Sequence, residues 1–250
     1  MKIIYVVPGP MDLSETARRG ELLKKWASPG TQVDITRVEE GPASIESAYE
    51  EYLSIPATAK LIFQLEKQGY HAAILGCAGD PGLEAMREIT LQMAVVGPGE
   101  TSMLVAAMLG YRFSLLTVMD SMIASSYELA HRAGVAAKLA SVRAINVAVL
   151  DLAKDKAATL DKIVRVGRQA IEEDGAHSLV LGCMSMGFLN VAEEVQEILG
   201  IPVINPSKVV LKTAEMLVGS GLSHSKKAYP LPPKLAEGKV KSLDELHVSG

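Results

Sequence analysis

A short segment occurs twice in this chain and limits the folds that the chain can adopt. Gly69–Cys77 reads GYHAAILGC, and Gly175–Cys183 reads GAHSLVLGC. Repetition on this scale predicts two structural units of similar plan, each with one cysteine at the same place. Further matches at similar offsets pair Val95–Pro98 with Val203–Pro206, and Ile3–Val7 with Phe113–Thr117.

Short apolar, β-branched runs alternate along the chain with longer stretches of helical spacing. The expected strands are Ile3–Val7, Val33–Val38, Ala72–Leu75, Met93–Val96, Phe113–Val118, Val142–Val149, Ser178–Leu181 and Pro202–Ile204. The expected helices are Ser14–Ala27, Ile55–Gln68, Pro81–Ile89, Thr101–Leu109, Ser121–Ala133, Lys156–Glu173, Ala192–Leu199 and Lys208–Val218. Buried strands that alternate with helices predict an α/β fold with mostly parallel sheets.

The repeat also predicts how the chain divides into domains. We expect a first α/β half from residues 1–100 together with 208–230, and a second half from residues 101–207, with a cleft between them. Residues 231–250 are polar and proline-rich, and we expect a tail that is loosely held or that contacts another copy of the chain.

Composition excludes several classes of function. The formal net charge is −4, and no block of like charge stands out, which argues against a nucleic-acid partner. The apolar runs are too short for a signal peptide or a membrane span, so we expect a soluble, cytoplasmic protein without a membrane partner. The cysteines lack CxxC spacing and the histidines form no HxxxH pair, which predicts neither a disulfide scaffold nor a metal site.

Both cysteines are predicted at the carboxyl end of a strand, just before a helix. Ligands bind at this edge of open α/β sheets, and two facing halves would bring both thiols to one cleft. Asp80 suits the N-cap and Pro81 the first position of the helix after Cys77. Ser185 suits a cap or a ligand contact after Cys183. Helix N-termini favour thiolates, so we expect a lowered thiol pKa and an acid/base pair.

Other interpretations of the same residues stay open. A lone cysteine that closes an apolar strand is usually a small buried hydrophobe, and two thiols can also close as a disulfide. The equivalent positions and the glycine before each cysteine favour a shared chemical role. Thr117 ends a strand at the ligand edge, and either binding or simple burial explains it. His71 and His177 begin their strands and are interpreted as structural, while Gly97–Glu100 is interpreted as a turn that lines the site.

At these residues the chain resembles the hydantoin racemases of the aspartate/glutamate racemase superfamily. The resemblance covers residues 1 to about 230 and rests on the elements Cys77–Leu83 and Leu181–Met186, with support from Pro42–Glu46. It implies two Rossmann-like domains, each with one catalytic cysteine, Cys77 and Cys183. It also implies racemisation of a small carbon acid by two bases, without a metal or another cofactor.

The same resemblance implies which residues bind the substrate. Ala78, Gly79, Met184 and Ser185 match positions that hold the carbonyl or carboxylate oxygens of the substrate, and Thr117 matches a further one. Two departures from the family pattern stand out. The first strand of the family commonly ends in Asn-Pro-Asn, whereas Pro8 here stands between Val7 and Gly9, so no side-chain amide is present. Met184 adds bulk beside a catalytic thiol.

Three functions follow from these observations. The first is a racemase or epimerase of a 5-substituted hydantoin, allantoin or an amino-acid-like substrate, and the paired cysteines favour it. The second is a decarboxylase or cis–trans isomerase of the same superfamily. The third is a small-molecule-binding protein without catalysis. Family analogy adds the expectation of a homo-oligomer.

Overall fold

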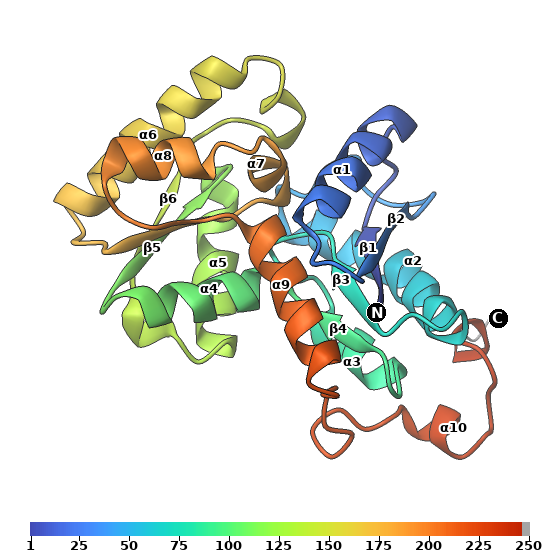
Figure 1. Ribbon diagram of the computed structural model, residues 1–250. Coiled ribbons are helices and arrows are strands. Elements are labelled where there is room, and N and C mark those ends of the chain that lie inside the picture. Colours follow the sequence, from blue (N-terminus) through green and yellow to red (C-terminus); the bar gives the residue numbers. More distant parts are fainter. Residues whose placement is uncertain (247–250) are drawn as a thin grey trace.

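Two parallel four-stranded sheets form the centre of the protein (Figure 1). The structure is a computed structural model that describes residues 1–246. The first sheet has the order β2-β1-β3-β4 and the second the order β6-β5-β7-β8, so β3 and β7 are equivalent strands. The predicted α/β class with parallel sheets is confirmed. The strands are β1 (Lys2–Val7), β2 (Gln32–Arg37), β3 (Ala72–Leu75), β4 (Ala94–Val96), β5 (Phe113–Thr117), β6 (Leu139–Ala144), β7 (Ser178–Leu181) and β8 (Val203–Ile204).

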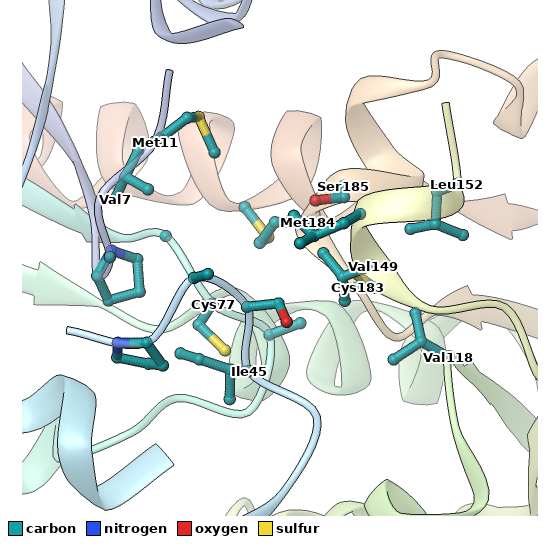
Figure 2. Close-up of a pocket in the computed structure, with 18 of the residues that line it drawn as sticks. Val7, Met11, Ile45, Cys77, Val118, Val149, Leu152, Cys183, Met184 and Ser185 are labelled. Atoms are coloured by element: carbon teal, nitrogen blue, oxygen red, sulfur yellow. The ribbon is translucent and has the colours of Figure 1, made fainter. Parts of the chain in front are cut away.

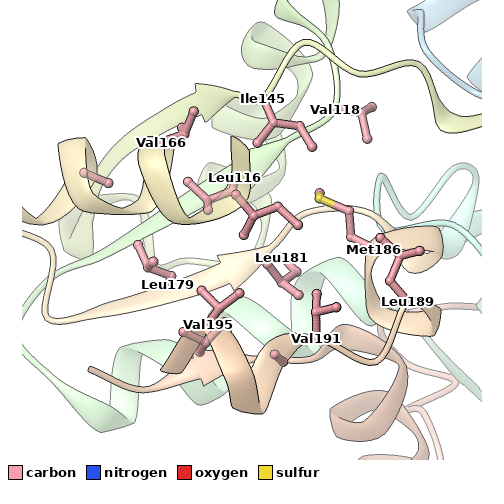
Figure 3. Packing of buried hydrophobic residues seen from close by; sticks show 14 of the residues in the cluster. Leu116, Val118, Ile145, Val166, Leu179, Leu181, Met186, Leu189, Val191 and Val195 are labelled. Carbon is pink, nitrogen blue, oxygen red and sulfur yellow. The ribbon is translucent and has the colours of Figure 1, made fainter. Parts of the chain in front are cut away.

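Both faces of each sheet are buried. Ile3 and Tyr5 of β1 pack into one apolar cluster, while Ile4 and Val6 pack into another on the opposite face. Figure 3 shows one cluster of the second sheet, in which Leu116 and other side chains of the strands meet side chains of covering helices. This burial explains why the strands are continuous apolar runs rather than alternating ones.

Helices cover these faces. They are α1 (Leu13–Trp26), α2 (Ala48–Lys67), α3 (Leu83–Ile89), α4 (Pro98–Leu109), α5 (Ile123–Arg132), α6 (Lys156–Glu172), α7 (Met184–Phe188), α8 (Ala192–Leu199), α9 (Pro206–Gly219) and α10 (Pro233–Ala236), with single 3₁₀ turns at Asp120–Met122, Ala136–Lys138, Val149–Asp151 and Asp244–Leu246.

Two helices cross from one sheet to the other. Helix α4 follows the last strand of the first sheet but packs against β5, β7 and β8 of the second. Helix α9 follows the last strand of the second sheet but packs against β3, β4 and α1. The two helices also pack against each other, and α9 lies between the two sheets in Figure 1. The division of the chain into two domains at the expected boundaries stays a prediction.

Two elements differ most from the boundaries expected from the sequence. Strand β6 ends at Ala144 rather than continuing to Val149, because Asn146 takes a left-handed conformation with φ of 51°. Helix α2 begins at Ala48 rather than Ile55. A capping box starts it, in which the Glu50 N–H donates to the Ser47 hydroxyl while the Glu50 carboxylate accepts from the Glu46 N–H.

The C-terminal segment runs along the first sheet. His224 Nε2 lies 3.0 Å from the amide nitrogen of Val95, at the edge strand β4, and Lys226 Nζ donates to the carbonyl of Arg87 over 2.6 Å. The tail expected from residue 231 includes α10 and an ion pair between Lys60 and Asp244. Its last part, 247–250, lies outside the described residues, and its role in an oligomer stays a prediction. Within residues 1–246, no helix is both long and apolar enough to cross a bilayer.

Candidate active site

The strand ends that carry the two cysteines are built alike. The N–H of Gly76 donates to the carbonyl of Val6, and the N–H of Gly182 donates to the carbonyl of Leu116, both over 2.8 Å. A Cβ at Gly76 would lie 2.5 Å from the Val6 oxygen, and one at Gly182 would lie 2.5 Å from a Leu115 methyl carbon. Only glycine fits at either position, and the next residue in each case is the cysteine, at the carboxyl edge of its sheet.

One cavity receives both cysteines. It has a volume of about 360 Å³ and is shown in close-up in Figure 2. This volume lies within the range of sites that hold small molecules. The catalytic and binding residues that the sequence analysis named line this cavity: Pro8, Cys77, Ala78, Gly79, Thr117, Cys183, Met184 and Ser185. The interpretation of Gly97–Glu100 as a turn lining the site is wrong, because this segment begins helix α4 and does not line the cavity. Their individual roles stay predictions.

Cys183 occupies the N-cap of α7 and faces several groups that favour a thiolate. Burial raises its pKa most strongly, whereas the N–H groups of Met186 and Ser185 and the guanidinium of Arg19 lower it. The next turn of α7 holds this loop against the first half, because the Phe188 ring lies 5.5 Å from the Tyr5 ring, edge to face.

Cys77 has a different environment. Burial raises the pKa of its thiol well above the ordinary range, and the nearby acidic side chains of Glu51 and Asp80 raise it further. The N–H of Gly79 acts in the opposite direction. The expectation of lowered pKa values is therefore wrong for both thiols in the free protein, since loss of hydration outweighs the helix N-termini.

Asp80 also caps a different helix from the one expected. Helix α3 begins at Leu83 after Gly82, which takes a left-handed conformation and offers no side-chain cap. The carboxylate of Asp80 instead accepts the N–H groups of Gly99 and Glu100, over 2.9 and 2.7 Å, at the start of α4. This capping also explains why α4 begins at Pro98, earlier than expected.

Arg19 is a candidate site residue that the sequence analysis missed. It is almost fully buried in α1 and lines the cavity. Its guanidinium pairs with Glu15 over 2.7 Å and donates to the Ser185 hydroxyl over 2.9 Å. One signal was present in the sequence, because Arg19 shares a helix face with the buried Leu23. A buried cation beside Cys183 can hold an oxygen atom that becomes negative during a reaction.

Segments from both halves meet at one side of the cavity. The loop that precedes α2 contributes Ile45, and the next residue, Glu46, accepts the N–H of Val149 over 2.6 Å. Ser121 donates to the Glu46 carbonyl, also over 2.6 Å. The wall on this side is apolar, as Figure 2 shows for Ile45, Val118, Val149 and Leu152.

The paired histidines lie at the other end of the strands. The Nδ1 atom of His71 accepts the N–H of Lys2 over 3.1 Å, and that of His177 accepts the N–H of Tyr111 over 3.2 Å. Both rings thus satisfy backbone groups at strand starts, as expected for structural histidines. Within residues 1–246, no group of three His, Cys, Asp or Glu side chains is arranged to hold a metal ion.

Known proteins are similar to this chain in both sequence and fold. The family model for Asp/Glu/Hydantoin racemase matches residues 13–214. The hydantoin racemase of Pseudomonas sp. (strain NS671) is 37% identical over 235 residues, which cover 94% of this chain and 93% of that protein. The structure of allantoin racemase from Pseudomonas fluorescens superimposes with a TM-score of 0.87 at 31% identity, covering 100% of both chains. Allantoin racemase from Klebsiella pneumoniae gives a TM-score of 0.86 at 30% identity, with 93% and 94% of the two chains covered.

These matches confirm the resemblance inferred from the two cysteine elements. The matched region includes both strand ends, both cysteines, the crossing helix α4 and the first part of α9. The chain belongs to the Asp/Glu/hydantoin racemase family and is an isomerase of the racemase type.

Proposed function

We propose that this racemase inverts the C5 centre of a 5-substituted hydantoin, with Cys77 and Cys183 as its acid/base pair. One observation carries the proposal: two half-buried cysteines, at equivalent strand ends of the two sheets, line one small cavity. A thiol on each side of a carbon acid is what a two-base inversion needs.

The proposed reaction moves one proton off the substrate and another onto it. One thiolate removes the C5 proton, and the electron pair of the broken C–H bond moves into the adjacent carbonyl, forming an enolate. The other thiol then donates its proton to the opposite face of C5. The residues after each cysteine, Ala78 and Gly79 on one side and Met184 and Ser185 on the other, hold the carbonyl oxygens. No group outside the chain is needed for these transfers.

The lining of the cavity supports a substrate with an apolar 5-substituent. Pro8 and Pro10 stand at the end of β1 and offer no side-chain amide, and the opposite wall consists of Val118, Val149 and Leu152. A ureido group, which allantoin carries, would leave polar atoms unpaired against this wall. The hydantoin racemase of the Pseudomonas strain supports the same substrate class.

The deciding experiment measures inversion and exchange together. The purified protein is incubated in deuterated water with L-5-benzylhydantoin and, separately, with allantoin, while optical rotation and loss of the C5 proton by NMR are followed. With the benzyl compound we expect the optical rotation to decay and the C5 proton signal to disappear. Cys77→Ser and Cys183→Ser should each lower the racemisation rate about a thousandfold. Full racemisation by either variant would refute the two-thiol scheme.

The same measurement separates the alternatives. A decarboxylase or cis–trans isomerase would leave the optical rotation of every hydantoin unchanged, and a non-catalytic binding protein would show thermal stabilisation by the ligand without exchange. Expectations of a homo-oligomer, of a cytoplasmic location and of independence from cofactors stay predictions.

A further inference from the structure

The carboxylate of Glu51 lies directly behind the Cys77 loop, outside the cavity. Glu51 belongs to the first turn of α2. A Cβ at Gly79 would lie 2.2 Å from Glu51 Oε1 and 3.8 Å from the sulfur of Cys77. Both atoms therefore flank the same glycine, within the roughly 6 Å over which a charge acts strongly on a neighbouring group.

This carboxylate has no structural task that would explain its place. Its Oε1 atom is buried and has no hydrogen-bond partner among the described residues. A buried carboxylate oxygen without a partner is costly, so its position calls for a functional explanation. Burial raises the pKa of the Glu51 carboxyl, and two groups on α5 also act on it: Arg132 favours its charged form and Glu128 opposes it.

The charges around the two thiols are unequal. Cys77 faces the acidic groups Glu51 and Asp80. Cys183 instead faces the Arg19 guanidinium, the Ser185 hydroxyl and the backbone N–H groups at the start of α7. Tyr5 is fully buried and interacts electrostatically with both thiols, so it does not distinguish one cysteine from the other. The halves are alike in topology but opposite in the sign of the charge that they place beside their cysteine.

We propose that Glu51 is a positioning residue that keeps the proton on Cys77, so that in the resting enzyme Cys183 ionises before Cys77 and serves as the base, with Cys77 as the thiol acid. The assignment rests on the proposed two-thiol racemisation and adds to it which cysteine starts as the base and which as the acid. After one turnover Cys183 holds the proton taken from the substrate and Cys77 is the thiolate. Exchange with water then restores the resting form.

The first test needs no variant. The protein is treated with iodoacetamide between pH 6 and 10, and alkylation of each cysteine is followed by peptide mass spectrometry, because the thiolate is the form that reacts. We expect Cys183 to be alkylated at lower pH than Cys77. Alkylation of Cys77 first, or of both thiols along one pH curve, would overturn the proposal.

The second test replaces Glu51 by its neutral isostere. In Glu51→Gln the pH at which Cys77 is half-reactive should fall by about one unit, while that of Cys183 stays unchanged. Glu194→Gln, which removes the same charge from the exposed side of α8, is the control and should move neither thiol. If Glu51 served only to stabilise the fold, its replacement would lower the melting temperature and leave the half-reactive pH of Cys77 unchanged, which would refute the proposal.

The third test uses the pH profile of kcat/KM, which reports the base of the free enzyme on its acid limb and the acid on its alkaline limb. Glu51→Gln should move only the alkaline limb, to lower pH. An unchanged alkaline limb would contradict the proposal. If no hydantoin is racemised at all, the proposed function fails, while the alkylation results still decide the order of the two thiols.

Discussion

At the scale of single residues, Ser185 links the buried cation of the first half to the thiol of the second. Its hydroxyl accepts a hydrogen bond from Arg19 and also stabilises the thiolate form of Cys183. Ser185→Ala removes this donor, so the pKa of Cys183 should rise and the acid limb of kcat/KM should move to higher pH by about one unit. A pH series of racemisation rates checks this. Ser185→Thr keeps the hydroxyl and should retain the wild-type limb; equal shifts in both variants would contradict the assignment.

Sequence reasoning at this scale found the cysteines and their neighbours but missed Arg19 and Glu51. The cysteines could be found because each is tied to a local pattern, a buried strand followed by glycine. Arg19 acts on Ser185, which lies far along the chain, and Glu51 meets Cys77 only across Gly79. Such contacts depend on how the halves are packed, and no local spacing encodes them. The raised thiol pKa values were missed for the same reason, since burial is a property of the assembled site.

At the scale of elements, the cap of α4 predicts how stability depends on pH. Burial raises the pKa of Asp80 to about 7, above its value in an unfolded chain. The folded protein therefore holds this proton more tightly, and the stability that results is lost as the pH rises from about 4 to about 7.

Asp80→Asn isolates this effect. The amide carries only one acceptor oxygen in place of two, so we expect the variant to be less stable by about 1 kcal/mol at pH 4. The deficit should shrink and then reverse between pH 4 and pH 7, because the amide never ionises while the wild type loses about 1.4 kcal/mol per pH unit in this range. Urea unfolding at pH 4, 6 and 8 measures the difference. A deficit that grows with pH would show that the Asp80 carboxylate is ionised throughout.

Element boundaries followed the sequence closely wherever apolar runs ended at a glycine or a cap. Strands β3 and β7 and helix α8 match the predicted ranges. The errors have local causes. The apolar run after Val142 continues past Asn146, whose left-handed backbone ends the strand. The predicted helix began at Ile55, whereas the cap at Ser47 begins α2 earlier and places Pro56 inside it.

At the scale of the whole molecule, Glu46 connects the first half to the second by hydrogen bonds beside the cavity. Its carboxylate and carbonyl accept hydrogen bonds from Val149 and Ser121, both in the second half. Glu46→Ala removes the contact with Val149, so we expect KM to rise about tenfold while kcat and the melting temperature change little. Steady-state racemisation and thermal unfolding test this. Glu46→Gln retains an acceptor oxygen and should stay near the wild type, whereas a KM unchanged in the alanine variant would exclude closure by this residue.

The exchange of α4 and α9 between the sheets has a consequence for biosynthesis. A ribosome releases the four strands of the first sheet within the first hundred residues, but α9, which covers β3 and β4, begins only at Pro206. Until then, one apolar face of that sheet lacks α9 and is covered only in part, by Leu23 and its neighbours in α1. The first half, although synthesised first, is therefore completed only after the second, when the last long helix docks beside the pocket.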